Sequence, residues 1–364
     1  MRNKIWNAVG LMSGTSMDGI DAAIIKTDGF SILEQGVFQT VPYDINFRSL
    51  LENLVNGQGQ LTHVERMLTL RHVEAIDVLL SKAGALPSEV DIIGFHGHTL
   101  SHNPAKKHTI QIGDGKLLAT NTHIDVVNDF RSSDVAKNGQ GAPLTPIYHK
   151  ALLNQEQLPS LVLNIGGVSN ITWIGKEDSE LIGFDTGPGN ALIDDWISAR
   201  TNEKFDVDGK IAAMGTIDRD MLANLLNHPF FLEPPPKSLD RNEFKSFSNQ
   251  FLHGLSTEVG AATLTAFTVN GIHKAIQGLS KPYKACIVVG GGRHNHSIMA
   301  GLKHHITGRV ISGDDLGWRG DAVEAQAFAF LAVRSRLGLP ISFPGTTGVP
   351  RPLTGGVFCS KTLD

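Results

Sequence analysis

A strand–turn–strand pattern occurs twice in this chain, about half the chain length apart, and this repeat limits the possible folds more than any other feature. In the first copy, the apolar runs 5–11 and 20–25 flank a turn rich in Gly, Ser and Thr, which is typical of a β-hairpin. In the second copy, the apolar runs 161–165 and 171–174 flank the Gly/Ser turn 166–170. An internal duplication explains why the pattern returns.

The length of 364 residues is compatible with two domains or one large domain, and the repeat favours two. We predict an N-terminal α/β domain over 1–155 and a C-terminal α/β domain over 156–364, joined by a linker at 155–159. Short apolar runs that alternate with helical periodicity support the α/β class. The expected helices include 61–84, 146–153, 191–199, 214–226, 260–276, 296–304 and 321–337, and the tail from Pro340 is expected to loop over the surface.

Composition excludes several classes of protein. The formal net charge is −4, so no basic excess indicates a nucleic-acid or anionic membrane partner. Cys286 and Cys359 are too few for a disulfide framework, which fits a reducing compartment. The first apolar run is too short for a signal peptide, and no segment approaches the roughly 20 apolar residues that span a bilayer. We therefore expect a cytoplasmic globular protein.

The turn of the first hairpin has the composition of an anion site. Gly14 and Gly19 allow the backbone to approach a ligand, and the hydroxyls of Thr15 and Ser16 can cradle an anion together with exposed N–H groups. Asp18 would repel a bare phosphate, so it fits better beside a phosphate that carries Mg²⁺. Considered alone, an ordinary surface hairpin explains this turn about as well.

A third Gly-rich turn follows the apolar run 285–289 and precedes a predicted helix. Gly290, Gly291 and Gly292 would let a flat base or a phosphate approach the backbone at the helix N-terminus. The Walker A pattern is absent from the chain, and Asn295 stands where the third Gly of a Rossmann fingerprint should be. The turn therefore predicts nucleotide binding of another kind.

Three histidines follow the predicted strand 90–95. His96, His98 and His102 suggest a metal site, and their spacing would suit two ligands on one face of a strand, but no acidic or cysteine ligand lies close by in the sequence. A polar loop that contacts substrate is therefore the favoured interpretation of this segment.

Other polar residues lie at predicted strand ends or helix starts. Arg131 could bind a carboxylate or phosphate in a bidentate fork, although a surface ion pair with Asp129 or Asp134 explains it equally well. Asp185 ends a short strand before a Gly-Pro-Gly turn, and strand ends are where ligand sites collect in α/β sheets. Glu324 lies in the first turn of a predicted helix, where it could also serve only as a partner of the helix dipole.

The three Gly-rich turns and the repeat together resemble the sugar kinase, actin and chaperone ATPase superfamily. The resemblance implies two duplicated actin/hexokinase-like domains with a central cleft that closes over ATP. It also implies two phosphate loops and an adenosine loop. Their residues would be Gly14, Thr15, Ser16, Asp18, Gly19 and Asp21 in the first loop, Asn164, Gly166 and Gly167 in the second, and Gly290, Gly291, Gly292 and Asn295 in the adenosine loop.

Within that superfamily the chain resembles the 1,6-anhydro-N-acetylmuramic acid kinase family over essentially its whole length. The blocks that carry the resemblance are MSGTSMDG at 12–19, GFHGHT at 94–99, QIGDG at 111–115, NDFR at 128–131, NIGG at 164–167 and GFDTGPGN at 183–190. Together these blocks are highly specific, whereas any one of them alone would not be.

The resemblance implies an enzyme of cell-wall recycling that converts an anhydro-sugar, ATP and water into N-acetylmuramic acid 6-phosphate and ADP. Asp185 would be the base that activates water, and Asp18 would hold Mg²⁺ through a water molecule. The residues expected to contact or orient the sugar are His96, Thr99, Arg131 and Glu324. The expected partners are small molecules, and the sequence leaves the oligomeric state open, with a homodimer as one possibility.

Two other functions remain open on the sequence alone. An ordinary sugar kinase of the same superfamily would phosphorylate a hydroxyl without opening a ring. An ATP-driven switch or filament protein would hydrolyse ATP without a sugar, but the polar HGHT, QIGDG and NDFR loops are more typical of a small-molecule pocket.

Overall fold

The computed structural model describes residues 4–14, 17–177, 180–239, 241–248 and 250–362. The described chain forms two compact α/β units, each of which has its own sheet and its own buried core. The first unit comprises Met1–Leu153 and Ala322–Asp364, and the second unit comprises Asn154–Asp321.

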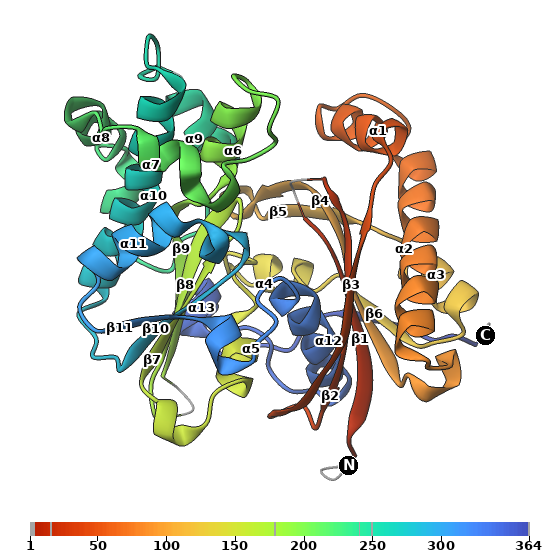
Figure 1. The fold of residues 1–364 in the computed structure, drawn as a ribbon. Coiled ribbons are helices and arrows are strands. Elements are labelled where there is room, and N and C mark those ends of the chain that lie inside the picture. The colour runs from red at the N-terminus through yellow and green to blue at the C-terminus, as the bar shows by residue number, and fades with distance from the viewer. Residues whose placement is uncertain (1–3, 15–16, 178–179, 240, 249, 363–364) are drawn as a thin grey trace. The chain divides into compact units, whose positions relative to one another are not determined.

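The place of the C-terminal segment differs from the sequence prediction, which assigned all of 156–364 to one domain. The helix α12 (Val323–Arg336) lies against the sheet of the first unit (Figure 1). Helix and sheet approach so closely that a Cβ built on Gly10 would lie 1.8 Å from the carbonyl oxygen of Ala325. This packing joins residues far apart in the sequence, so no local pattern could indicate that the chain returns to the first unit.

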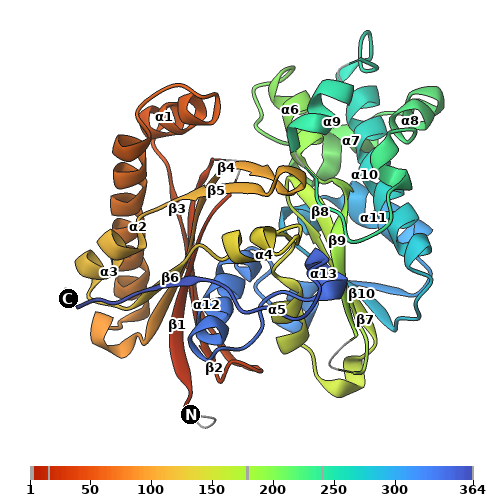
Figure 2. The same ribbon diagram turned by 180° about the vertical axis from the view of Figure 1, so that it is seen from behind.

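The sheet of the first unit has the strand order β12-β6-β4-β1-β2-β3, and β5 pairs with β4. The strands are β1 (Trp6–Ser13), β2 (Gly19–Thr27), β3 (Ile32–Pro42), β4 (Ile92–Asn103), β5 (His108–Ile112), β6 (Val126–Asn128) and β12 (Val357–Cys359). The β1–β2 and β2–β3 pairs are antiparallel, whereas β4 is parallel to β1 and β6 is parallel to β4. Figure 2 shows the C-terminal strand beside β6, and the two strands pair in antiparallel register. The expected surface loop therefore contains a sheet strand.

Helices cover both faces of this sheet. The helices of the first unit are α1 (Ile45–Val55), α2 (Leu61–Ala83), α3 (Gly115–Thr122), α4 (Ser132–Ala136), α5 (Pro146–Ala151), α12 (Val323–Arg336) and α13 (Pro344–Thr347). Successive side chains of a strand point to opposite faces, so Val9 and Leu11 pack with Ala75 and Leu79 of α2, whereas Gly10 faces α12. Figure 1 shows α2 and α12 on opposite sides of the sheet.

The sheet of the second unit repeats the topology of the first. Its strands are β7 (Ser160–Ile165), β8 (Val168–Ile174), β9 (Leu181–Pro188), β10 (Ala285–Val289) and β11 (Arg309–Ser312). The order β11-β10-β7-β8-β9 corresponds to β6-β4-β1-β2-β3, with the same antiparallel and parallel pairs. The predicted duplication is therefore confirmed at the level of strand order and direction.

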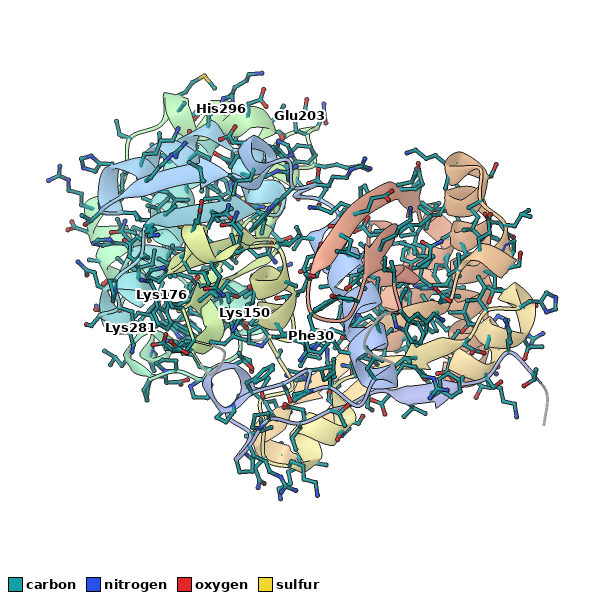
Figure 3. The ribbon with its side chains drawn as sticks, turned by 90° about the horizontal axis from the view of Figure 1, so that it is seen from below. Phe30, Lys150, Lys176, Glu203, Lys281 and His296 are labelled. Carbon is teal, nitrogen blue, oxygen red and sulfur yellow. The ribbon has the colours of Figure 1, made fainter. Side chains whose placement is uncertain are left out.

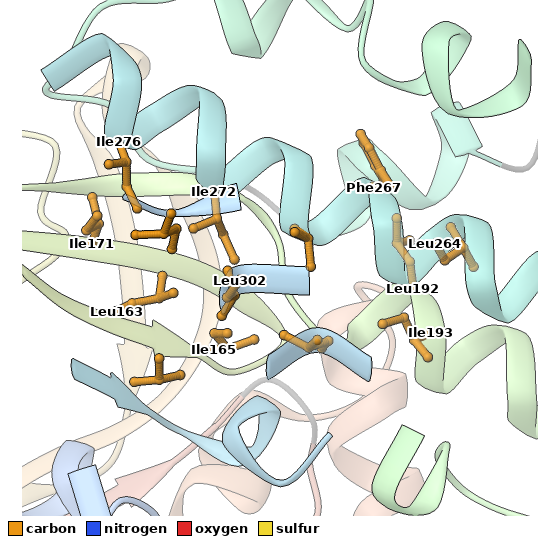
Figure 4. Packing of buried hydrophobic residues seen from close by; sticks show 14 of the residues in the cluster. Leu163, Ile165, Ile171, Leu192, Ile193, Leu264, Phe267, Ile272, Ile276 and Leu302 are labelled. Carbon is orange, nitrogen blue, oxygen red and sulfur yellow. The ribbon is translucent and has the colours of Figure 1, made fainter. Parts of the chain in front are cut away.

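The core of the second unit lies between its sheet and the helix α10. Its helices are α6 (Ala191–Ser198), α7 (Lys210–Met214), α8 (Arg219–Leu225), α9 (Arg241–Ser248), α10 (Thr257–Leu279) and α11 (His296–His305). Figure 4 shows Ile272 and Ile276 of α10 above Leu163 and Ile171 of the sheet, and all four side chains are buried. Polar residues such as Lys176, Glu203, Lys281 and His296 are exposed at the surface of this unit (Figure 3). Among the described residues, no helix is both long and apolar enough to cross a membrane.

Candidate functional site

The first Gly-rich turn connects β1 to β2 in the first unit. Gly14 directly follows β1, and Gly19 is the first residue of β2. Thr15 and Ser16, which were predicted to cradle an anion, lie outside the described residues. A Cβ built on Gly19 would lie 2.4 Å from the carbonyl oxygen of Val41, so the backbone of neighbouring strand β3 requires glycine at this position.

Two carboxylates accompany this turn. Asp18 is exposed, and its Oδ1 lies 3.8 Å from Nη1 of Arg48. Asp21 lies on β2, where its Oδ1 accepts a hydrogen bond of 2.6 Å from Oγ1 of Thr40. Asp18 is thus the more accessible of the two acidic groups, because its ion pair with Arg48 is long and its side chain is exposed.

A buried hydrogen-bonded chain supports the end of β1. The hydroxyl of Tyr43 donates to Oγ of Ser13 at 2.8 Å, and the same oxygen lies 3.0 Å from Nδ1 of His98. Burial lowers the pKa of His98 to about 4, so its imidazole is neutral at physiological pH. No local sequence pattern predicts the hydrogen bond from Tyr43 to Ser13, because the two residues are 30 positions apart in the sequence.

A bulge in β4 separates His96 from His98, and both histidines lie within this strand. Gly97 has a φ of 72°, and the β1–β4 register shifts at this point. His96 therefore packs on α12, with its ring 4.5 Å from that of Phe328, whereas His98 contacts Ser13 and interacts electrostatically with His72 of α2. The expectation that these histidines share one strand face is wrong for His96 and His98. No group of three His, Cys, Asp or Glu residues within the described ranges is arranged to hold a metal ion.

The structure brings three of the predicted sugar-binding residues to the α12 face of the first unit. Nε of Arg131 donates to Nε2 of His96 at 3.1 Å, and Nδ1 of the same imidazole lies 2.9 Å from the carbonyl oxygen of Gly97. Burial and the adjacent guanidinium hold the pKa of His96 well below its usual value. Glu324 lies one helical turn before Phe328, on the same side of α12 as the ring that contacts His96.

A second nitrogen of the Arg131 guanidinium donates a hydrogen bond to the backbone. Nη1 of Arg131 donates to the carbonyl oxygen of Gly141 at 2.7 Å. The buried Asp134, which the sequence left as a possible ion-pair partner, accepts hydrogen bonds from the backbone N–H of Gly141 at 2.7 Å and from Oγ1 of Thr347 at 2.6 Å. Thr99, the fourth residue predicted to contact sugar, accepts through its Oγ1 a hydrogen bond of 3.2 Å from Gln111.

The second Gly-rich turn lies at the carboxyl end of β7 in the second unit. The carbonyl oxygen of Gly166 accepts from the N–H of Asn190 at 2.7 Å, and that of Gly167 accepts from the N–H of Gly189 at 2.9 Å. A Cβ on Gly189 would lie 2.2 Å from the Gly166 oxygen, so this approach requires glycine. The turn is thereby joined to the GPG segment that follows Asp185.

Asp185 lies inside β9, opposite Asn170 of β8. The prediction that it ends a strand is wrong, because the strand continues to Pro188. It is 8% exposed, and its Oδ2 accepts a hydrogen bond of 2.8 Å from the N–H of Leu239. Its own N–H donates to the carbonyl oxygen of Lys237 at 3.0 Å. Burial lowers the pKa of the Lys237 ammonium group, against the opposing effect of Glu233 and Asp185. The segment 237–239 therefore holds this carboxylate in place.

The third Gly-rich turn lies at the carboxyl end of β10, next to β7. Gly290 has a φ of 78°, and a Cβ there would lie 2.3 Å from Oδ1 of Asn164. A Cβ on Gly292 would lie 2.3 Å from Cγ2 of Ile165, whereas one on Gly291 would meet its nearest atom, Nδ2 of Asn190, at 3.6 Å. The second and third turns are thus in direct contact, and Gly291 has the most space beside it.

Asn295 has a structural role in this turn. Its Oδ1 accepts a hydrogen bond of 3.0 Å from the N–H of Ile298 and so forms the N-cap of α11. The same oxygen lies 2.2 Å from the position of a Cβ built on Gly209.

In each unit the predicted residues gather at the carboxyl edge of the parallel strands, where α/β sheets bind ligands. Two units with one shared strand order and with Gly-rich turns at these edges define a protein of the actin and hexokinase-like sugar kinase class. The family model for anhydro-N-acetylmuramic acid kinase matches residues 7–361, and the chain belongs to that family. It is therefore an enzyme of the phosphotransferase class.

Named relatives support this assignment over the full length. The anhydro-N-acetylmuramic acid kinase of Paramagnetospirillum magneticum is 49% identical over 349 residues, which cover 96% of this chain and 98% of that protein. The protein of the same name from Rhodospirillum rubrum is 48% identical over 359 residues, covering 97% of this chain and 94% of that protein.

Proposed function

We propose that this kinase opens the 1,6-anhydro ring of anhydro-N-acetylmuramic acid with water and phosphorylates the released O6 with ATP. Water would add to C1 while the C1–O6 bond breaks, and O6 would take the γ-phosphoryl group as the bond to ADP breaks. The products would be N-acetylmuramic acid 6-phosphate and ADP. The buried carboxylate of Asp185 carries this proposal, because ring opening by water needs a base.

The setting of Asp185 suits a general base. Leu239 donates a backbone hydrogen bond to Oδ2, which fixes the orientation of the carboxylate. After Asp185 the strand continues to Pro188, and Gly189 packs on the second Gly-rich turn, where an added Cβ would lie 2.2 Å from the carbonyl oxygen of Gly166. The carboxylate would accept the proton that the attacking water loses. An ordinary hexokinase-type base would instead take the proton of a substrate hydroxyl.

The Gly-rich turns would hold the nucleotide. Gly166 and Gly290 lie at strand ends, where phosphate groups and a base could approach the backbone of the turns. Asp18 fits a Mg²⁺ ion bound together with ATP, because a single accessible carboxylate suffices when phosphate and water supply the other ligands. When bound, the ion would neutralise the charge of the phosphate groups.

The α12-face cluster of the first unit would recognise the sugar. Its members are His96, Arg131 and Glu324, and Thr99 extends it along β4. The guanidinium of Arg131 is suited to the lactyl carboxylate of the substrate, and the neutral imidazole of His96 keeps that guanidinium in place. The carboxylate of Glu324 could accept hydrogen bonds from sugar hydroxyl or amide groups.

Product analysis tests the proposed reaction. The purified enzyme would be incubated with anhydro-N-acetylmuramic acid and ATP in water enriched in heavy oxygen. Ring opening predicts a product that contains one phosphoryl group and one water more than the substrate, with the heavy oxygen at C1. N-acetylglucosamine, which has no anhydro ring, serves as the matched acceptor. A product that gains phosphate without water would contradict ring opening and favour an ordinary sugar kinase.

A role in recycling of cell-wall sugars in the cytoplasm belongs to the same proposal. The substrate is a fragment of peptidoglycan, and ATP is available in the cytoplasm. Cys286 and Cys359 are both free thiols, which fits a reducing compartment. Accumulation of anhydro-N-acetylmuramic acid in cells that lack the gene would support this role, and normal levels of that sugar would contradict it.

A further inference from the structure

Arg293, which lies inside the third Gly-rich turn, makes a dense set of polar contacts within the second unit. Its Nη1 and Nη2 bind Oδ1 and Oδ2 of Asp321 at 2.5 and 2.9 Å, which is a bidentate fork. Its Nε donates to Oδ2 of Asp314 at 2.7 Å. Nη1 also donates to the carbonyl oxygen of Gly290 at 3.0 Å, so the side chain is hydrogen-bonded to the backbone of the turn that contains it.

The guanidinium is enclosed, whereas its acidic partners are accessible. The Arg293 side chain is 5% exposed, compared with 47% for Asp314 and 53% for Asp321. Hydrogen bonding to Arg293 lowers the pKa of Asp321, so both groups of this pair are charged at neutral pH. Burial of a guanidinium is costly unless acceptors replace the water that it loses, and here Asp314, Asp321 and the carbonyl oxygen of Gly290 do so.

Backbone contacts join the same two segments. The N–H of Gly290 donates to the carbonyl oxygen of Gly320 at 3.3 Å. A Cβ built on Gly320 would lie 2.5 Å from Nε of Arg293, so any larger residue would displace the guanidinium. The turn also packs on the sheet, because Cγ2 of Ile165 lies 2.3 Å from a Cβ built on Gly292. Arg293 thus adds a second set of contacts that hold the turn.

We propose that Arg293 is a positioning residue that holds the Gly290–Asn295 turn against Asp314 and Asp321 in the conformation that accepts the adenosine half of ATP. The inference rests on the proposed nucleotide site at this turn. Arg293 itself faces the 313–321 segment and need not contact the nucleotide. Lysine cannot replace it, because a single ammonium group cannot reproduce a planar fork that binds both carboxylates and a carbonyl oxygen.

Steady-state kinetics of Arg293→Lys test this inference. We expect the KM for ATP to rise about tenfold, which corresponds to one lost charge-assisted hydrogen bond. The KM for the sugar and kcat should change less than about twofold, because only the nucleotide turn moves. Arg309→Gln, which removes an exposed arginine of β11 in the same unit, is the matched control and should leave all three constants unchanged.

Gly320→Ala provides an independent test, because it displaces the guanidinium without removing any charge. It should raise the KM for ATP as Arg293→Lys does, and its effect should be less than additive with that of Arg293→Lys. If Arg293→Lys does not fold, Gly320→Ala alone still tests the inference. An unchanged KM for ATP in both folded variants would overturn the inference, and so would an equal rise in the KM for ATP and for the sugar.

Nucleotide binding separates this inference from the proposed reaction. The dissociation constant of a non-hydrolysable ATP analogue is measured by calorimetry for the wild-type enzyme, Arg293→Lys and Arg309→Gln. Weaker binding by Arg293→Lys alone would support the positioning role even if the wild-type enzyme did not open the anhydro ring. Equal binding by all three proteins would overturn the role, whatever the reaction.

Discussion

Nε of Arg131 donates a hydrogen bond of 3.1 Å to Nε2 of His96. A guanidinium nitrogen can only donate, so this nitrogen of the imidazole must be the acceptor. The proton of the neutral ring is then on Nδ1, which lies 2.9 Å from the carbonyl oxygen of Gly97. The bulge at Gly97 therefore determines the tautomer of His96, and His96 in turn orients the guanidinium that is proposed to bind the sugar.

Replacement of Arg131 by lysine should reduce activity toward the sugar. The ammonium group cannot bond to His96 and to the carbonyl oxygen of Gly141 at once, so we expect kcat/KM for the sugar to fall roughly 10- to 100-fold. The KM for ATP should stay within about twofold of wild type. Steady-state kinetics with each substrate varied check both values. Arg66→Lys on the exposed face of α2 is the control, and equal kinetics of the two variants would contradict a role for Arg131.

The parts of the fold that the sequence predicted are those encoded by neighbouring residues. Both hairpins and the helix α2 follow local apolar periodicity, and the structure contains them. The return of 322–364 to the first unit depends on Gly10 and Gly94, which admit the backbone of α12. That complementarity joins distant segments, so it could not be recognised before the fold was known.

The same distinction applies to the candidate site. The Gly-rich turns could be identified because their composition is unusual over a few consecutive residues. The backbone hydrogen bond from Leu239 to Asp185 and the contact of Tyr43 with Ser13 connect residues 54 and 30 positions apart. The bulge at Gly97, which places His98 on the opposite face of the sheet from His96, also has no distinct sequence pattern, because glycine occurs in many strands.

Gly10→Ala should destabilise the first unit. The added methyl group would lie 1.8 Å from the carbonyl oxygen of Ala325, so α12 must move away from the sheet. We expect the free energy of unfolding to fall by about 1–3 kcal/mol or more, as measured by urea denaturation. Gly278→Ala on α10 is the control, because no atom lies within 4 Å of its added Cβ, and it should be neutral or slightly stabilising. Equal stability of the two variants would contradict the tight packing of α12.

The buried His72 should make folding stability depend on pH. Its pKa is lowered from 6.5 to about 4 by burial, while Nδ1 lies 2.8 Å from the carbonyl oxygen of Leu68. Between these pH values the unfolded chain binds a proton that the folded chain does not, so stability falls as the pH decreases. His72→Gln should therefore give a shallower decrease in the free energy of unfolding between about pH 7 and pH 5. The exposed His63→Gln on the same helix should retain the wild-type slope, and equal slopes for all three proteins would contradict a buried neutral His72.

Asp18→Asn should weaken the use of Mg²⁺. The variant keeps the size of the side chain but removes the charge proposed to hold the ion, so the Mg²⁺ concentration for half-maximal activity should rise roughly tenfold. Titration of activity with MgCl₂ at saturating ATP measures this change. Asp77→Asn, an exposed substitution on α2, should behave as wild type. Full activity of the wild-type enzyme after exhaustive chelation would refute the proposed Mg·ATP site.

Asp185→Asn should remove the base and leave the nucleotide site intact. Asparagine retains the acceptor oxygen for the N–H of Leu239, so the fold around β9 should persist. Loss of a general base typically reduces turnover about 10²- to 10⁴-fold, and we expect a decrease in kcat within that range. The affinity for a non-hydrolysable ATP analogue and the melting temperature should match those of wild type. The control is Asp220→Asn, an exposed substitution on α8 of the same unit.

The three measurements on Asp185→Asn distinguish the possible roles of this carboxylate. A metal ligand would lose Mg²⁺ dependence and nucleotide affinity together with turnover. A purely structural residue would lose about 1 kcal/mol of stability and little activity, because the N–H of Leu239 would donate to a neutral amide oxygen instead of a charged carboxylate. A base loses turnover alone. Near-normal turnover in a well-folded variant would therefore exclude Asp185 from the chemistry, and the water that opens the anhydro ring would require a different acceptor for its proton.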